Sequence, residues 1–339
     1  MLYEIPLLQH ADPTTIEEAL GLLTVYGERA KVIAGGTDLL GLIKDGVCGP
    51  KMPMPEVLVN MGSIPELKVL EIDSEQRLRI GAAVSLTDLE ESNVVRKKYP
   101  IISQACSSIA TLQIRNAGTV GGNLCQRPWC WYFRSPAFDC FKKGGDRCYA
   151  ITGENQYYFS VHGLGICVMS HPSDLAPALM ALGSELEIAS GSGIKRVPLD
   201  KFFLGAREVF ETILRPDEFI IAVNVPNPPA GARMAFLKNR IRDTWDFSLS
   251  SAAVLLEILD GVCTDSRIVL GGLAPFPYRA YDAEDSLRNS RIDQDVATEA
   301  ARKALRKAKG LSMNKYKLEL GAVILRDAIL QAAKGNPQL

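Results

Sequence analysis

The feature that most constrains this chain is a glycine pair placed directly after an apolar run, in the stretch KVIAGGTDLL at residues 31–40. The run that starts at Val32 is typical of a short buried strand, and the residues after Gly36 resume an apolar pattern typical of a helix. Glycines let backbone N–H groups approach an anion closely. The stretch therefore predicts a strand and a helix joined by a turn, which is either a simple connection or a phosphate-binding loop. Thr37 and Asp38 are candidates to cap the helix.

A second glycine-rich stretch, RNAGTVGGN at residues 115–123, follows a predicted helix. Gly118, Gly121 and Gly122 can bring backbone N–H groups to a phosphate, and Asn123 can hydrogen-bond it. Two such loops in one half of a chain suit a dinucleotide, because a diphosphate takes donors from more than one side. Neither loop has the G-x-G-x-x-G fingerprint of a Rossmann NAD site or the lysine of a P-loop, so both of these site types are disfavoured.

Composition narrows the class of protein. A chain of 339 residues is long enough for two or three domains, and its 47% apolar and 23% charged content is typical of a globular protein. A net charge of -1 argues against binding to nucleic acid or anionic lipid. No apolar stretch is as long as a membrane span. The first residues lack the basic region of a signal peptide, so we expect a cytoplasmic location.

The pattern of elements changes at a predicted linker, VPNPPAGAR at residues 225–233, which is rich in proline and glycine. Before it, short strands and helices are predicted to intermingle. After it, we expect antiparallel strands followed by two helices around residues 294–309 and 313–333. A further strand is expected at residues 166–170.

Five of the eight cysteines lie in one segment, at Cys125, Cys130, Cys140, Cys148 and Cys167. Periodicity fails in this segment, which has few aliphatic residues with which to fold, and metal ligation would supply the missing folding energy. Without an export signal the crowding favours metal over disulfides. The wide and uneven separations suit an iron–sulfur cluster better than the paired knuckles of structural zinc, although zinc and disulfides remain as alternatives.

Three motifs in order, KVIAGGTDLL, RNAGTVGGNL and HPSDLAPALMALG, resemble the FAD-binding medium subunits of the molybdenum hydroxylases, a group that includes xanthine dehydrogenase, aldehyde oxidoreductase and carbon monoxide dehydrogenase. FLKNRIRDTWDFSLSSAAV resembles the start of their C-terminal domain. The resemblance covers nearly the whole chain. It implies an α+β protein, with a PCMH-type (VAO-like) FAD-binding fold of two α/β subdomains and a CO-dehydrogenase-flavoprotein-like C-terminal domain, an antiparallel sheet with helices. The implied bounds are 1–60, 61–226 with an inserted loop at 124–167, and 232–339.

The resemblance also assigns residues to FAD. Asp174 would bond the ribityl chain or nearby polar atoms, with a helix N-cap as the alternative role. Lys238 would lie near the flavin, where a positive charge stabilises a reduced, anionic ring, with a solvated strand position as the alternative. His171 either titrates near neutral pH or is a hydrogen-bonded structural histidine. The residues implied to wrap the diphosphate are Lys31, Val32, Ile33, Ala34, Gly35, Gly36, Thr37, Asp38, Leu39, Gly118, Thr119, Gly122 and Asn123.

The cysteine segment resembles the inserted loop of 4-hydroxybenzoyl-CoA reductase and of the bacterial periplasmic aldehyde oxidoreductase, which carries a [4Fe-4S] cluster. The match falls on RPWC, FDC, DRC and GIC, which implies Cys130, Cys140, Cys148 and Cys167 as ligands. Cys125 is then a reserve ligand or, more simply, a buried free thiol. The basic residues of the segment either offset the cluster charge, form a solvated rim or face a partner; they are Arg127, Arg134, Lys142, Lys143 and Arg147.

The resemblance implies an electron-transfer subunit with no catalytic residue of its own. Substrate would be oxidised on a large molybdopterin-binding partner, and a small partner with [2Fe-2S] clusters would exchange electrons with the FAD of this chain. A partner's export signal is an alternative route to the periplasm. Two rival classes stay open: a self-sufficient flavin oxidoreductase related to the UDP-N-acetylenolpyruvoylglucosamine reductases, and a zinc-stapled nucleotide-binding module.

Overall fold

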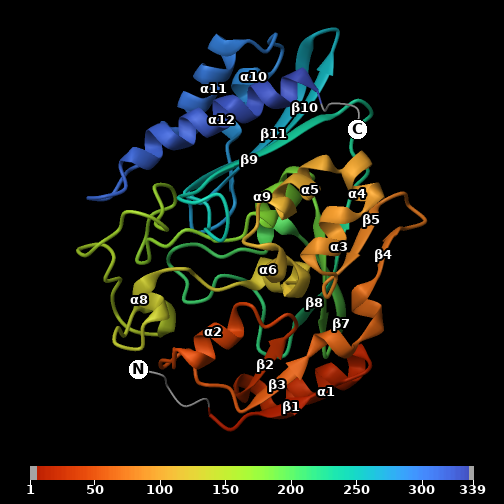
Figure 1. Cartoon of the computed structure of the whole chain (residues 1–339), viewed down its shortest axis with the longest axis vertical. Coiled ribbons are helices and arrows are strands. Elements are labelled where there is room, and N and C mark those ends of the chain that lie inside the picture. The colour runs from red at the N-terminus through yellow and green to blue at the C-terminus, as the bar shows by residue number, and fades with distance from the viewer. Residues whose placement is uncertain (1–5, 336–339) are drawn as a thin grey trace.

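The computed structural model describes residues 6–335, which form three sheets with helices between and around them (Figure 1). The first sheet has three parallel strands in the order β1-β3-β2, with bounds Gln9–Ala11, Val57–Asn60 and Ala30–Ile33. Helix α1 (Ile16–Tyr26) follows β1, and the short helix α2 (Leu39–Lys44) follows β2. The strand, turn and helix predicted around the first glycine pair are therefore confirmed.

The second sheet is antiparallel and five-stranded, in the order β4-β5-β8-β6-β7. Strand β8 is buried along its whole length because both of its faces are covered. Phe219 and Ile221 pack with α1 and the first sheet, whereas Ile220 joins the core beneath the helices. The five strands are Leu70–Ile72, Leu78–Gly81, Phe219–Val225, Glu185–Ser190 and Gly193–Pro198.

Six helices accompany this sheet, and two of them flank the second glycine-rich stretch. Helix α6 (Leu112–Ala117) ends within the stretch, and α7 (Val120–Cys125) begins within it. The PSD motif, formed by Pro172, Ser173 and Asp174, leads into α9 (Leu175–Ala181), which is buried along its length. The others are α3 (Leu86–Glu91), α4 (Asn93–Lys98) and α5 (Pro100–Ser107).

The third sheet is antiparallel, as predicted, in the order β12-β11-β10-β9, with bounds Tyr278–Arg279, Val262–Gly271, Ser250–Leu259 and Arg233–Asn239. Helices α11 (Gln294–Leu305) and α12 (Tyr316–Lys334) cover one face, close to their predicted positions. Helix α10 (Tyr281–Leu287) was not predicted. None of the helices within residues 6–335 is long and apolar enough to cross a membrane.

The cysteine segment lies between α2 and the N-terminal end of α12 (Figure 1). It contains one short helix, α8 (Trp131–Arg134), and a small core in which Phe133 and Phe159 pack with Leu42 of α2. The strand predicted at residues 166–170 is wrong, because only a single bridge between Phe159 and Met169 forms there. Aromatic side chains thus supply the core that aliphatic residues supply elsewhere.

Candidate functional site

The two glycine loops touch each other. A Cβ atom added to Gly35 would lie 1.8 Å from the backbone oxygen of Ala117, so the close approach of the loops requires glycine. Gly36 has φ +69°, a left-handed conformation that glycine adopts without strain. In the second loop Thr119 Oγ1 accepts a 3.2 Å hydrogen bond from the Gly122 N–H and caps α7. The two stretches predicted separately therefore form one structural unit.

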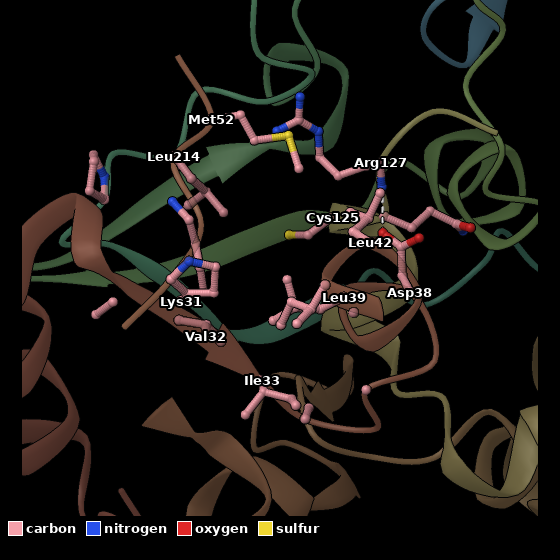
Figure 2. A pocket seen from close by; sticks show the side chains of 18 of the residues that line it. Lys31, Val32, Ile33, Asp38, Leu39, Leu42, Met52, Cys125, Arg127 and Leu214 are labelled. Carbon is pink, nitrogen blue, oxygen red and sulfur yellow. Dashed lines mark hydrogen bonds between the residues drawn. The ribbon is translucent and has the colours of Figure 1, made fainter. Parts of the chain in front are cut away.

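Residues of this unit line two cavities. The large cavity, of about 380 Å³, is lined by the first loop together with side chains such as Met52, Arg127 and Leu214 (Figure 2). The small cavity, of about 80 Å³, is lined by the second loop and by the PSD motif. The residues that line both cavities are Thr37, Asp38, Thr119, Gly122 and Gln126. The arrangement suits a ligand with two bulky ends joined at its middle.

The residues predicted to hold FAD are brought together around these cavities. All of the first-loop residues, from Lys31 to Leu39, line the large cavity. Gly118, Asn123, Asp174 and Lys238 line the small one, and Thr119 and Gly122 line both.

Asp38 does not cap α2 as expected. It occupies the N-cap position, but its side chain makes no hydrogen bond to the helix. Its carboxylate instead accepts a 2.8 Å hydrogen bond from the Arg127 N–H and forms a 2.5 Å ion pair with Arg134 Nη2. The dashed line in Figure 2 marks the hydrogen bond from the Arg127 backbone to the Asp38 carboxylate at the edge of the large cavity. The first loop is thus attached to the cysteine segment.

Asp174 and Lys238 form an ion pair in the wall of the small cavity. Asp174 occupies the N-cap position of α9 without capping it, because Ser173 Oγ accepts the hydrogen bond from the Ala176 N–H. Lys238 lies 2.6 Å from Asp174 Oδ2 with only 3% of its side chain exposed, so it is not a solvated strand residue. The lysine charge is balanced within the protein.

Several cavity residues were missed by reasoning from the sequence. Trp129, Trp245 and Phe247 line the small cavity, and Trp129 and Phe247 pack with ring centroids 5.1 Å apart. Met52 and Leu214 line the large one. Met52 and Leu214 come from irregular segments without periodicity or motif. Trp245 and Phe247 lie in the stretch at residues 236–254 that resembles the start of the C-terminal domain, but the resemblance assigned no site role to them.

The four predicted cysteine ligands, Cys130, Cys140, Cys148 and Cys167, line one narrow cavity of about 10 Å³, which is called the cysteine cavity below. All four are free thiols, so the disulfide alternative is not realised. Hydrogen bonding from the Cys167 thiol lowers the pKa of Cys148 below that of a free thiol. Cys125 lines the large cavity instead. Within residues 6–335, no group of three or more His, Cys, Asp or Glu side chains is placed as the ligands of a single metal ion would be.

Two lysines are buried beside the cysteine cavity. Lys142 lines it and forms an ion pair with Glu211 at 3.4 Å, while Lys143 Nζ donates a 2.8 Å hydrogen bond to the Ser135 carbonyl. Arg147, by contrast, is 67% exposed and pairs with its neighbour Asp146. The idea of a solvated rim therefore fits Arg147 but not the lysines.

His171 does not titrate near neutral pH. Burial lowers its pKa to about 3. Its Nδ1 accepts a 3.3 Å hydrogen bond from the Ser173 N–H, next to the PSD aspartate, and its ring packs edge-on against Phe203. It is a neutral structural histidine.

Comparison with known proteins identifies the class. Residues 8–228 match the FAD-binding domain in molybdopterin dehydrogenase, and residues 235–332 match the CO dehydrogenase flavoprotein C-terminal domain. The aldehyde oxidoreductase FAD-binding subunit PaoB of Escherichia coli (strain K12) is 36% identical over 81% of this chain and 83% of its own length. The nicotine 6-hydroxylase medium subunit of Paenarthrobacter nicotinovorans is 28% identical over 89% and 88%.

Solved structures agree on the fold. Reconstituted carbon monoxide dehydrogenase from Oligotropha carboxidovorans superposes with a TM-score of 0.78 and 24% identity, covering 98% of this chain and 100% of the other. The chain belongs to the family of FAD-binding medium subunits of the molybdenum hydroxylases. It is an FAD-binding oxidoreductase subunit with the α+β fold that the resemblance implied.

Proposed function

We propose that the chain holds FAD with the diphosphate between the two glycine loops, the flavin end at the small cavity and the adenosine end in the large cavity. The contact of Gly35 with Ala117 carries this proposal, because it brings the first loop against the second at the residues that line both cavities. The N–H groups of Gly121 and Gly122 in the second loop already bond to Ala82 O and Thr119 Oγ1, so we infer that the first loop supplies most of the backbone donors. Trp129 and Phe247 offer the small cavity apolar ring surface. The Asp174–Lys238 pair presents polar atoms beside it.

The chain's role is to place and tune a carrier of electrons, and the substrate is oxidised elsewhere. FAD supplies the capacity to take up and release electrons when bound. We expect a large molybdopterin-binding subunit and a small [2Fe-2S] subunit as partners, since the curated relatives are called medium or FAD-binding subunits. We expect the assembled complex in the cytoplasm, or in the periplasm if a partner carries an export signal.

We further propose that the cysteine cavity is the site of a [4Fe-4S] cluster. The donor set fits, because Cys130, Cys140, Cys148 and Cys167 are free and surround one space with aromatic walls. Thiolates on a four-iron cluster stand further apart than the ligands of one ion, so a loaded site needs the narrow walls to move outward. Lys142 is buried and lines the cavity, so its ammonium group would supply positive charge beside an anionic cluster.

The test is a visible spectrum with iron and sulfide analysis of the full chain purified anaerobically. We expect flavin absorption, iron and sulfide in wild-type protein. The Cys140→Ser variant should lose iron and keep FAD at saturating FAD concentration, whereas a Cys263→Ser variant, on β11 and remote from the cavity, should keep both. Full iron content in Cys140→Ser would contradict the ligand assignment.

The same preparations separate the rival functions. Substrate turnover by the purified chain alone would favour a self-sufficient flavin oxidoreductase. A colourless protein that contains zinc and no flavin would favour a zinc-stapled module.

A further inference from the structure

The turn at residues 127–134 forms part of the wall of both the small cavity and the cysteine cavity. Trp129 lines the small cavity, whereas Pro128 and Cys130 line the cysteine cavity. Cys130 is also the N-cap residue of α8, and its carbonyl accepts a 2.8 Å hydrogen bond from the Arg134 N–H. Any ligand that fixes Cys130 therefore fixes the start of α8 and the turn beside the small cavity.

Arg134 is locked onto this turn. Its Nε donates a 2.9 Å hydrogen bond to the Pro128 carbonyl, and its Nη2 donates a 3.1 Å hydrogen bond to the Arg127 carbonyl. Its guanidinium lies 4.6 Å from the ring centroid of Trp129. The side chain can reach the first glycine loop in its present position only while the turn keeps this shape.

The ion pair from Arg134 to Asp38 is the charged link between that turn and the first loop. Within residues 6–335, Asp38 is the one carboxylate within ion-pair distance of Arg134. The neighbouring Arg127 guanidinium is paired elsewhere, with Glu211 Oε2 at 2.7 Å. Asp38 lines both the large and the small cavity, so its position affects the space on both sides of the loop.

We propose that Arg134 is a positioning residue through which metal loading of the cysteines strengthens FAD binding. The inference rests on the proposed function of both sites. A loaded cluster orders the turn, the ordered turn holds Arg134, and Arg134 holds the glycine loop in its binding conformation. FAD then binds to a glycine loop that is already ordered, so its binding costs less conformational entropy. Because coupling between two binding sites is reciprocal, bound FAD also strengthens retention of the metal.

The test measures the FAD dissociation constant of the full chain, together with iron content, in four proteins: wild type, Arg134→Gln, Cys140→Ser and the double variant. Loss of metal in Cys140→Ser should weaken FAD binding about tenfold, and Arg134→Gln should weaken it by a similar factor. The double variant should be no weaker than about the worse single variant, because both changes remove the same coupling.

Matched variants separate positioning from folding. Arg147→Gln removes the same charge from an exposed site of the segment and should leave FAD affinity unchanged. Arg134→Lys should restore part of the affinity by keeping the charge beside Asp38. If Arg134→Gln does not fold, Asp38→Asn tests the same pair from the other side and should show the same non-additivity with Cys140→Ser.

The outcomes distinguish this inference from the proposed function. Wild-type protein without flavin or without iron would contradict the proposed function. If wild type holds flavin and iron, two results would overturn the coupling alone. One is a loss of FAD affinity in the double variant that equals the product of the two single losses. The other is an unchanged FAD affinity in Arg134→Gln.

Discussion

Lys238 Nζ lies 2.6 Å from Asp174 Oδ2, and the two residues come from β9 and the start of α9, so a single buried ion pair joins the C-terminal sheet to the PSD motif. Ser248 Oγ donates to the other carboxylate oxygen at 2.5 Å, and Lys238 also donates to the Ser108 carbonyl at 2.9 Å. Each oxygen of the Asp174 carboxylate therefore accepts one side-chain hydrogen bond. It fixes the wall of the small cavity by contacts from three separate segments.

Removing one member of this pair is expected to be costly. Asp174→Ala leaves Lys238 buried without a counter-charge, and we expect it to lower the free energy of unfolding by about 3–5 kcal/mol. The double variant Asp174→Asn with Lys238→Met should recover much of this loss, because no unpaired charge remains. Urea denaturation of wild type, Asp174→Ala and the double variant measures the three free energies of unfolding and checks their expected order. Equal stability of Asp174→Ala and wild type would show that the lysine escapes to solvent.

Substitution of Gly35 is expected to separate the two loops. In Gly35→Ala the new methyl group meets the Ala117 backbone, which cannot move aside as a side chain can, and we expect a loss of at least roughly 2 kcal/mol of stability together with FAD binding. Gly41→Ala in the adjacent helix α2 is the matched control, since a Cβ there meets nothing within 4 Å. Flavin content after gel filtration reports the result. Full flavin in Gly35→Ala would contradict the placement of the diphosphate.

His171 gives a pH dependence with a defined sign. Its pKa is about 3 in the folded chain against 6.5 for an unperturbed histidine, so between these values only the unfolded chain binds the proton. The contribution of His171 is therefore fully present above pH 6.5 and is lost as the pH falls, at roughly 1.4 kcal/mol per pH unit. At pH 5 the loss is about 2 kcal/mol.

The His171→Leu variant should weaken this dependence. Urea midpoints at pH 7.5 and pH 5 are compared for wild type, His171→Leu and a control, His10→Gln, whose side chain is exposed. The control should behave as wild type. An unchanged pH effect in His171→Leu would assign the acid sensitivity to other groups.

Lys317 is expected to hold the cysteine segment against α12. Its ammonium group is fully buried and donates hydrogen bonds of 2.9, 2.9 and 2.6 Å to the carbonyls of Tyr157, Phe159 and Gly272. Lys317→Met removes the donor of the Tyr157 and Gly272 carbonyls, while the Phe159 carbonyl keeps its hydrogen bond from Asn314, and we expect a cost of roughly 2–4 kcal/mol. Hydrogen exchange at residues 155–160 should accelerate. Lys315→Met, an exposed lysine in the same region, should leave exchange as it is.

The glycine loops could be predicted because their signal is local. A strand, two glycines and a helix follow one another within ten residues, and the conformation of Gly36 is one that few other residues adopt. The antiparallel sheet and two long helices after the linker were likewise marked by periodicity in short windows. That Gly35 touches Ala117, however, follows only from the packing of two loops that lie far apart in the chain.

The partners of the charged residues could not be predicted. Asp38 and Arg134 are separated by 96 positions, and Lys317 and Tyr157 by 160, so no spacing rule connects them. A lysine such as Lys317 is expected at the surface, and only the carbonyls gathered around it make burial tolerable. The convergence of the cysteines was expected from the family resemblance, since the segment has no periodicity of its own.

The cysteine segment is attached at two distant places, to the turn after β2 through Asp38 and to the start of α12 through Lys317. Residues 125–167 are therefore not a portable module. If this stretch were inserted into a homologue with a shorter loop, the residues that hold it in this chain would be missing. The inserted segment should then remain disordered. To graft it successfully, an engineer would have to carry an acid at the position of Asp38 and a basic anchor at that of Lys317 along with it.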